Sequence, residues 1–171
     1  MSTLYGDGMT EEITPADHAH LRRCVELARQ ALDDGDEPFG SVLVDADGAV
    51  RFEDHNRVKG GDQTRHPEFE IARWAVANLS PDERRSCVVY TSGEHCAMCS
   101  AAHAWNGLGR IVYASSTEQL VRWHEEWGIA PGPVAALPIT AVAPGITVAG
   151  PDPELANEIR AMHARLHDVT S

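Results

Sequence analysis

Two cysteines separated by two residues are the clearest chemical feature of this chain. Cys96 and Cys99 stand in the segment Tyr90-Thr-Ser-Gly-Glu-His-Cys-Ala-Met-Cys-Ser100, which begins like a strand and breaks at its glycine. If a helix begins at these cysteines, both thiols project to the same side of its first turn. Two thiolates supply only half of the four ligands that zinc takes, so another protein ligand must come from elsewhere.

A histidine and a glutamate upstream could supply the missing metal ligand and a proton carrier. His66 lies before Pro67, a residue suited to the first helical position, and Glu68 follows. Zinc held by one imidazole and two thiolates keeps a position for water and lowers the pKa of that water toward neutrality. Displacement of an amine also needs proton transfer by a carboxylate that is near the metal and not bound to it. We therefore predict His66, Cys96 and Cys99 as zinc ligands and Glu68 as the proton carrier.

Each part of this pattern also has a simpler explanation. The cysteine pair alone is as consistent with a structural zinc or a redox pair as with catalysis. Glu68 alone would be an ordinary acid stabilised at a helix N-terminus. The combination of both motifs favours catalytic zinc. Cys24 and Cys87, which belong to neither motif, are predicted to be small buried apolar side chains.

The elements that must position these residues are indicated by hydrophobic periodicity. A helix is predicted from Thr14, a suitable N-cap, to about Asp34. Apolar runs joined by Asp47-Gly48 predict a β-hairpin. The predicted elements are helices at 14–34, 67–79, 97–106, around 120–127 and 152–166, strands at 39–45, 49–55, 86–92 and 110–114, and strand-like segments at 139–143 and 146–149. Both halves of the proposed site therefore fall at the start of a helix that follows the sheet, where α/β proteins form ligand sites.

Alternation of strands and helices predicts an α/β fold, a three-layer α/β/α sandwich. We expect a five-stranded mixed sheet of order 2-1-3-4-5 that begins with an antiparallel hairpin. The 171 residues form one domain. Residues 1–13 are expected to be a flexible arm, 14–127 the core, and 128–171 a Gly/Pro-rich linker, the last strands and a C-terminal helix.

Composition limits the partners of the chain. The formal net charge is −12, and Lys59 is the only lysine. A nucleic-acid partner draws on clustered basic residues, so this balance argues against one. The sequence has no export signal and no apolar run long enough for a membrane span, which predicts a cytoplasmic protein without a membrane partner.

The two motifs together resemble the H-x-E and P-C-x-x-C signature of the cytidine-deaminase-like zinc hydrolases. The resemblance covers about residues 15–125, through Phe39-Gly40, Asn56, the segment 91–94 and the segment 110–113. It is nearest to the branch that includes guanine deaminases, fungal-type cytosine deaminases and tRNA adenosine deaminases. The resemblance implies that His66, Cys96 and Cys99 hold zinc and that Glu68 moves protons. It also implies that Asn56 hydrogen-bonds the heterocycle and that the protein is a homodimer.

Two departures from the family pattern affect substrate choice. Pro67 replaces the usual alanine, whose backbone N–H can serve the bound base, so that contact is missing or replaced. His95 stands where the signature has proline, which puts a titratable ring beside the metal ligands. We expect His95 to be either a solvent-facing substitute or a residue that recognises substrate.

Further candidates for substrate contact have competing structural roles. Glu94 could touch substrate or tie down its loop by accepting backbone N–H groups. Phe39 and Trp105 could stack on a flat base, although aromatic side chains are more often part of the core. The segment Trp123-His-Glu-Glu-Trp127 could close over the pocket, but a solvated helix face with two core tryptophans is the favoured reading.

The sequence therefore predicts a zinc-dependent hydrolytic deaminase. Its substrate would be a free nucleobase or related small amino-heterocycle of cytosine, guanine or amino-triazine type, with release of ammonia. One alternative is a tRNA adenosine deaminase that uses Arg65, Arg73, Arg84, Arg85 and Arg110 as a basic patch. A third possibility, from another class, is a non-catalytic interaction domain that zinc stabilises.

Overall fold

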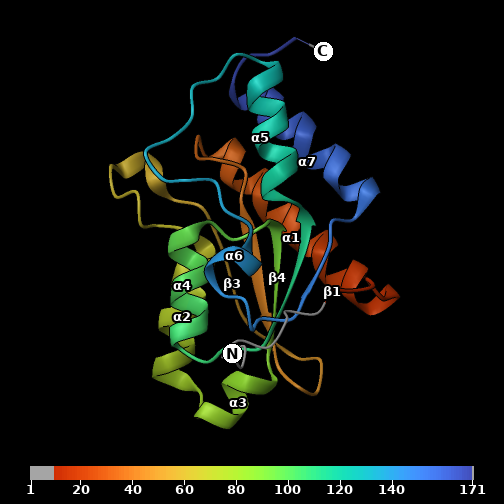
Figure 1. Ribbon diagram of the computed structural model, residues 1–171, viewed down its shortest axis with the longest axis vertical. Helices are drawn as coiled ribbons and strands as arrows, with labels where there is room; N and C mark the ends of the chain where they lie inside the picture. The colour runs from red at the N-terminus through yellow and green to blue at the C-terminus, as the bar shows by residue number, and fades with distance from the viewer. Residues whose placement is uncertain (1–9, 171) are drawn as a thin grey trace, which may run out of the picture.

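A mixed sheet of six strands organises the fold (Figure 1). The computed structural model describes residues 10–170. The strands are β1 (Thr10–Glu11), β2 (Gly40–Val44), β3 (Val50–His55), β4 (Val88–Gly93), β5 (Arg110–Ser115) and β6 (Val148–Ala149). Their spatial order is β1-β6-β5-β4-β2-β3. β2 is antiparallel to both β3 and β4, whereas β4, β5, β6 and β1 are mutually parallel.

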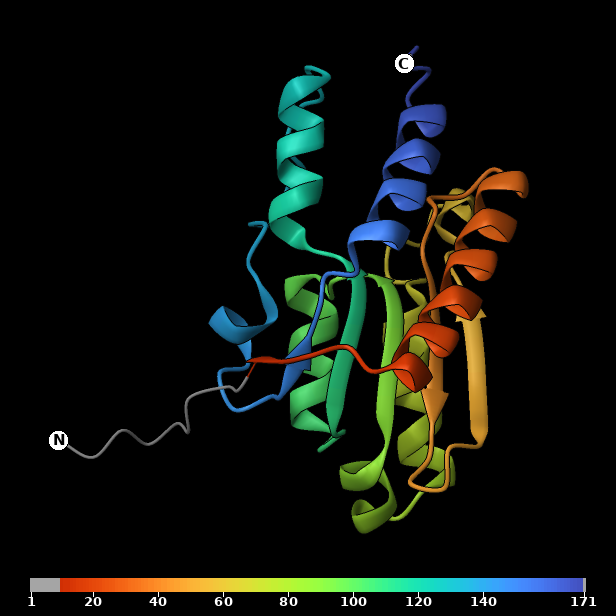
Figure 2. The ribbon, with the colours of Figure 1, turned by 90° about the vertical axis from the view of Figure 1, so that its right-hand side faces the viewer.

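Helices cover both faces of this sheet. They are α1 (Pro15–Asp33), the 3₁₀ turn η1 (Val58–Gly60), α2 (Pro67–Asn78), α3 (Pro81–Ser86), α4 (Ala97–Trp105), α5 (Thr117–Glu126), α6 (Ile139–Val142) and α7 (Pro153–Leu166). α1 and α7 pack on one face, and α2 and α4 on the other. Figure 2 shows α5 and α7 rising beyond the carboxyl ends of β4 and β5. No helix in residues 10–170 has the length and apolar character that a membrane crossing needs.

Alternating side chains of β2 and β4 belong to two different hydrophobic clusters, one on each face of the sheet. Val42 and Val44 of β2 pack toward α1 and α7, while Leu43 between them packs toward α2. The same alternation separates Val89 from Tyr90 on β4. Successive strand residues point to opposite faces, so an apolar run on a central strand fills both layers.

The predicted three-layer sandwich, the initial hairpin and the order of the five predicted strands are confirmed. The count of five is wrong because Thr10 and Glu11 add a sixth strand at the edge beside β6. These two residues lie in the segment that was expected to be a flexible arm. The rest of that expectation, for residues 1–9, lies outside the described residues.

Two short helices also differ from the prediction. Residues 139–142 form the helical turn α6 and not a strand, since the carboxylate of Glu94 accepts the backbone N–H of Ile139 at 2.9 Å and caps its start. α3 was not predicted, although its capping box is visible in the sequence. Ser80 accepts the N–H of Glu83, whose carboxylate accepts the N–H of Ser80.

A buried ionic network fixes the start of α1 on the sheet. Asp17 accepts hydrogen bonds from Arg110 of β5 at 2.9 Å and from the hydroxyl of Tyr90 of β4 at 2.8 Å. Burial raises the pKa of Asp17, but the hydrogen bonds from Arg110, Thr14 and Tyr90 outweigh it and lower that pKa to about 2. The ionised carboxylate is therefore the form that the folded protein stabilises.

Replacing Asp17 by Asn is expected to lower the free energy of unfolding by about 2 kcal/mol at pH 7. The folded pKa of about 2 lies below the ordinary value of 3.8, so this contribution is complete above the ordinary value and is lost as the pH falls toward 2. Urea unfolding at pH 7 and at low pH should show the difference between wild type and D17N shrinking on acidification. Exposed Asp47→Asn is the control. A difference that does not depend on pH would contradict the proposed ion pairing.

Candidate metal and catalytic site

The three predicted metal ligands lie where α2 and α4 begin side by side. His66 is the N-cap of α2 and Pro67 occupies its first turn. Cys96 is the N-cap of α4, and Cys99 lies within the first turn. α4 follows directly from the carboxyl end of β4, and α2 packs against it, so residues distant in sequence meet at one end of the sheet (Figure 1).

The donor atoms of these residues have the spacing of a zinc site. Nδ1 of His66 lies 3.7 Å from Sγ of Cys96 and 3.7 Å from Sγ of Cys99. Tetrahedral zinc, with bonds of about 2.3 Å to sulfur and 2.0–2.1 Å to nitrogen, places such donors about 3.5–3.8 Å apart. One imidazole and two thiolates are also a donor set typical of zinc. The two distances from His66 to the sulfurs therefore match those of a zinc site, and all three donors lie within 4.8 Å of one another. His66 and Cys96 are half-buried and Cys99 is buried, so the cluster is open on one side.

The charge state of the cluster favours a cation. The thiol of Cys99 hydrogen-bonds to Cys96 and, with His66, lowers the pKa of Cys96 to about 4. The same contact and burial raise the pKa of Cys99, while the thiolate of Cys96 raises that of His66. One thiolate is thus already formed, and metal binding would displace the proton that remains on Cys99.

Glu68 is buried beside the ligands. Its Oε1 accepts hydrogen bonds from the hydroxyls of Ser41 and Thr91, both at 3.0 Å, and its Oε2 lies 3.7 Å from Sγ of Cys99. Burial raises the pKa of Glu68, and the charge of His66 partly offsets this. One carboxylate oxygen is therefore held by hydroxyls while the other faces the ligand cluster, which is the arrangement that a proton carrier requires.

The hydroxyls of Ser41 and Thr91 were not predicted as part of the site. They hold the carboxylate of Glu68 from strands β2 and β4, and Oγ of Ser41 also lies 2.9 Å from Oγ1 of Thr91. Both lie inside otherwise apolar strands and are completely buried. A buried hydroxyl needs a partner, so polar residues in such strands are the signal that could have revealed them.

Asn56 lies just beyond β3 with an unpaired amide nitrogen. The side chain is completely buried, and its Oδ1 accepts the backbone N–H of Val58 at 3.2 Å. Nδ2 has no hydrogen-bond partner among the described residues. An unpaired buried amide costs free energy, so this donor is placed to bind an acceptor that is not part of the chain.

Glu94 ties two helices together. Its Oε2 accepts the N–H of Thr117 at 2.8 Å and its Oε1 accepts the N–H of Ile139 at 2.9 Å, which places the carboxylate at the starts of α5 and α6. Of the two roles expected for Glu94, the structure shows the loop-tying one. Its contact with substrate remains a prediction.

The two aromatic candidates lie in different places. Phe39 is half-buried, and its backbone carbonyl accepts the N–H of Asn56 at 3.0 Å. Its ring lies so close to Gly93 that a Cβ at that glycine would come within 2.8 Å of it. Trp105 is 89% exposed at the end of α4 opposite Cys96, about 13 Å away along the helix. The structure does not bring Trp105 to the ligand cluster, and its stacking on substrate remains a prediction.

His95 is buried and does not face solvent. It is 1% exposed, its ring packs edge-on against His103 at 5.5 Å, and burial lowers its pKa. Neither ring nitrogen has a hydrogen-bond partner among the described residues. The solvent-facing alternative is wrong because the turn before α4 directs this ring inward. Its role in recognition remains a prediction.

The segment from Trp123 to Trp127 follows the favoured prediction. Trp123 is 6% exposed in the core and Trp127 packs against the same cluster. Glu125 and Glu126 are exposed, and Glu126 pairs with Arg160 at 2.8 Å. The two carboxylates therefore belong to a solvated helix face.

Comparison with known proteins gives a consistent group of relatives. The family described as the cytidine and deoxycytidylate deaminase zinc-binding region matches residues 14–115. A probable cytosine deaminase of Schizosaccharomyces pombe is 37% identical over 122 residues, which are 70% of this chain and 73% of that protein. A guanine deaminase of Bacillus subtilis is 37% identical over 97 residues, 56% of this chain and 62% of that protein, so the match spans less than two thirds of the relative. A tRNA-specific adenosine deaminase of Agrobacterium fabrum is 33% identical over 102 residues, 58% of this chain and 66% of that protein.

Solved structures of similar fold include a protein studied in complex with a purine. A protein in complex with 2,6-diaminopurine has a TM-score of 0.68 and 25% identity, and the match covers 94% of this chain and 86% of that chain. The guanine deaminase of Bacillus subtilis has a TM-score of 0.54 and 29% identity, and the match covers 71% of this chain and 82% of that chain.

Proposed function

This chain belongs to the cytidine and deoxycytidylate deaminase zinc-binding family, and from that membership we propose that it removes an amino group hydrolytically from a free nucleobase or related small amino-heterocycle. The substrate would be of cytosine, guanine or amino-triazine type, and ammonia would be released. The chain is an enzyme of deaminase type by its family. The observation that carries the finer proposal is the burial of Glu68 beside His66, Cys96 and Cys99.

In this proposal each residue of the site has a separate task. His66, Cys96 and Cys99 would hold zinc, which when bound supplies Lewis acidity and lowers the pKa of a coordinated water. Glu68 Oε2 would take the proton that the attacking water loses and deliver it to the ring nitrogen. Glu68 would then take the remaining proton from the added hydroxyl and pass it to the exocyclic nitrogen, so that ammonia leaves as the carbonyl forms. Ser41 and Thr91 keep Glu68 oriented throughout.

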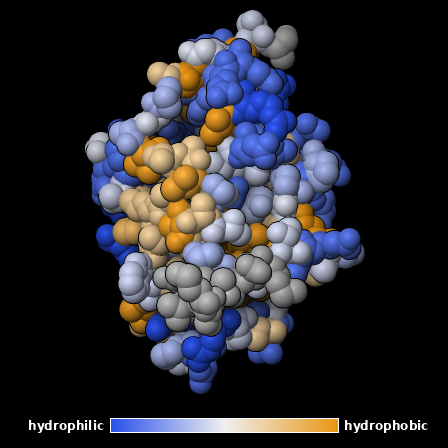
Figure 3. Space-filling model, viewed as in Figure 1, coloured by the Kyte–Doolittle hydropathy of each residue, from blue (hydrophilic) through white to orange (hydrophobic). Residues whose placement is uncertain are grey.

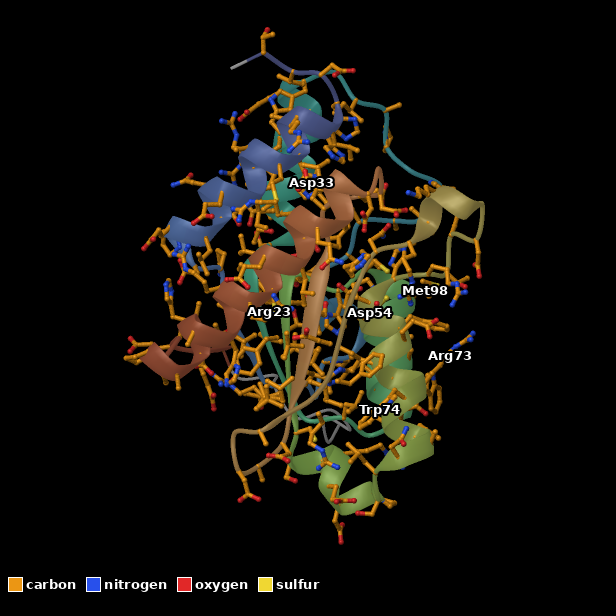
Figure 4. The ribbon with its side chains drawn as sticks, turned by 180° about the vertical axis from the view of Figure 1, so that it is seen from behind. Arg23, Asp33, Asp54, Arg73, Trp74 and Met98 are labelled. Carbon is orange, nitrogen blue, oxygen red and sulfur yellow. The ribbon has the colours of Figure 1, made fainter. Side chains whose placement is uncertain are left out.

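A small substrate fits the charge distribution better than RNA does. The arginines considered for a basic patch mostly have partners within the chain: Arg110 pairs with Asp17, Arg85 with Asp82, Arg65 with Asp62 and Glu70, and Arg84 binds the carbonyls of Leu79 and Asn106. Arg73 points away from α2 over the ring of Phe69 (Figure 4). Phosphate binding needs cations that gather on one surface, and paired arginines on a chain of charge −12 do not offer that.

The test is turnover of a substrate panel by zinc-loaded protein. Cytosine, guanine, 2,6-diaminopurine, amino-triazines and a tRNA substrate with a loop adenosine are incubated separately, and ammonia and the deaminated product are measured. We expect turnover of at least one free heterocycle and no salt-dependent binding of tRNA. Deamination of tRNA alone would favour a tRNA adenosine deaminase. Inactivity on every compound would overturn the proposal.

Asn56→Asp is expected to lower kcat/KM about 10- to 100-fold, which corresponds to one hydrogen bond of about 1–3 kcal/mol. The aspartate keeps the oxygen that accepts the N–H of Val58, so the turn is preserved, but it has no N–H to offer a substrate in place of Nδ2. Steady-state kinetics and thermal unfolding separate the two effects. Exposed Asn78→Asp controls for the added charge. Unchanged kcat/KM in N56D would contradict a role of Asn56 in substrate binding.

We also propose a homodimer that forms through an apolar surface. Figure 3 shows apolar side chains gathered on the face that carries α4 and α6. This surface, the α4–α6 patch, consists of Ala101, Ala104, Trp105, Val142, Ala143, Pro144 and Ile146. An indole that is 89% exposed within such a patch is typical of the centre of an interface.

Trp105→Ser is expected to convert a dimer into monomers at micromolar concentration in sedimentation velocity. The exposed indole would lose the apolar contact area that holds the two copies together. Val76→Ser, an exposed apolar position on α2, should leave the dimer intact. A monomeric wild type, or a W105S variant that still dimerises like wild type, would refute this interface.

Finally, we propose that the protein acts in the cytoplasm as a single deaminase domain. The support is chemical, because Cys96 and Cys99 bind metal only as reduced thiolates and all four cysteines are free. Cell fractionation that finds the active protein only outside the cytoplasm would reject this location.

A further inference from the structure

Three histidines that are remote from the first site in sequence converge between two helices. His124 of α5 meets His163 and His167, which are one turn apart on α7. Their candidate ligand atoms all lie within 4.8 Å of one another. The ring centroid of His124 lies 6.2 Å from that of His163 and 5.3 Å from that of His167. We call these residues the three-histidine cluster.

The cluster lacks the partners that buried imidazoles normally have. Within residues 10–170, His163 is only 3% exposed, so its ring lies in the core. Nε2 of His124 is buried and without a partner in the same part of the chain. By contrast, buried His103 places its Nε2 2.7 Å from the carbonyl of Gly109. An unpaired buried nitrogen is costly, so Nε2 of His124 lacks a group that would bind it.

Its protonation state suits a metal ion. Burial, with the neighbouring histidines, lowers the pKa of His163 to about 3, and burial also lowers the pKa of His124. Both rings are therefore neutral near pH 7, which is the form that binds metals.

We propose that the three-histidine cluster binds a second transition-metal ion of the class that imidazole favours, such as Zn²⁺. Three nitrogens bound at about 2.0–2.1 Å lie about 3.3–3.5 Å apart, so the cluster must contract slightly from its present spacing. His167 is exposed and its side chain can rotate to close this gap, whereas His163 is fixed in the core. The exposed side leaves the remaining coordination position to water.

A metal ion in the three-histidine cluster would link α5 and α7 to residues near the His66, Cys96 and Cys99 ligands. An ion shared by His124 and α7 fixes α5 against α7 beyond the carboxyl ends of β4 and β5 (Figure 2). His163 also contacts the ring of Phe39 at 5.2 Å, and Phe39 lies against Gly93 at the end of β4. The loop that leads to Cys96 begins at Gly93. A metal ion bound to the three-histidine cluster would therefore restrain the residues around this loop.

Metal counting tests the proposal independently of turnover. Protein stripped of metal is titrated with Zn²⁺ by calorimetry, and bound zinc is counted by elemental analysis. Wild type is expected to bind two ions per chain, H124A and H167A one, and C99A one. His20→Ala, which removes a histidine outside the cluster, should still bind two. With Co²⁺, the thiolate charge-transfer absorption should vanish in C99A and persist in H167A.

Stability gives a second measurement. Zn²⁺ should raise the Tm of C99A, because the cluster remains, but not that of the double variant C99A/H167A. His167 is exposed, so its loss should not disturb folding, and H167Q can replace H167A if near-ultraviolet circular dichroism shows otherwise. Equal zinc content in wild type and H167A would overturn the proposal, as would a wild type that binds one ion, the one lost in C99A. The zinc contents of wild type and the variants do not depend on turnover, so failure of the deaminase assay would leave this test unchanged.

Discussion

Glu68→Gln is expected to lower kcat about 10²- to 10⁴-fold, the range that a positioned proton carrier contributes. The amide oxygen of glutamine can still accept hydrogen bonds from Ser41 and Thr91, so the side chain keeps its place. It cannot take up or release a proton at Oε2, the atom that faces the ligand cluster. The Tm should not fall, since the variant removes an ionisable group from a buried position.

The measurement combines steady-state kinetics with metal analysis of the same sample. E68Q should contain as much zinc as wild type, which separates proton transfer from metal binding. Glu70→Gln is the matched control, because Glu70 lies on the same helical turn and is half-buried. Turnover of E68Q within a few-fold of wild type would rule out Glu68 as the proton carrier.

Cys99→Ala is expected to abolish both turnover and zinc binding at the first site. The substitution leaves His66 and Cys96 as the only ligands, and two protein ligands do not retain zinc well. The loss of bound metal also removes stabilisation of the folded state, about 4 kcal/mol where free zinc exceeds its dissociation constant a thousandfold. Treatment of wild type with a strong chelator should reproduce both effects.

The matched control for this variant is Cys87→Ala. Cys87 is buried to the same extent but lies in the apolar core away from the ligands, so C87A should keep zinc and turnover with a modest loss of stability. The three variants then give different signatures: E68Q has metal without activity, C99A has neither, and C87A has both. Zinc-dependent turnover in C99A would contradict the assignment of its thiolate.

Much of the fold could be predicted because its signals are local. Thr14 and Asp17 form the capping box that starts α1, and the alternation on β2 and β4 reflects burial on both faces. The order of five strands follows from the hairpin and the crossover helices. The sixth strand could not be predicted, since Thr10 and Glu11 become a strand only by pairing with β6, far along the chain.

The candidate site divides in the same way. Sequence by itself determined the ligand types, their spacing and the proximity of Glu68, because a helical turn places residues three apart on one side. Only the tertiary structure decided that His95 turns inward, that Trp105 faces outward and that Ser41 and Thr91 hold Glu68. It alone brought His124 to α7. Side-chain direction and partners depend on contacts between distant segments, and those contacts form only when the helices pack on the sheet.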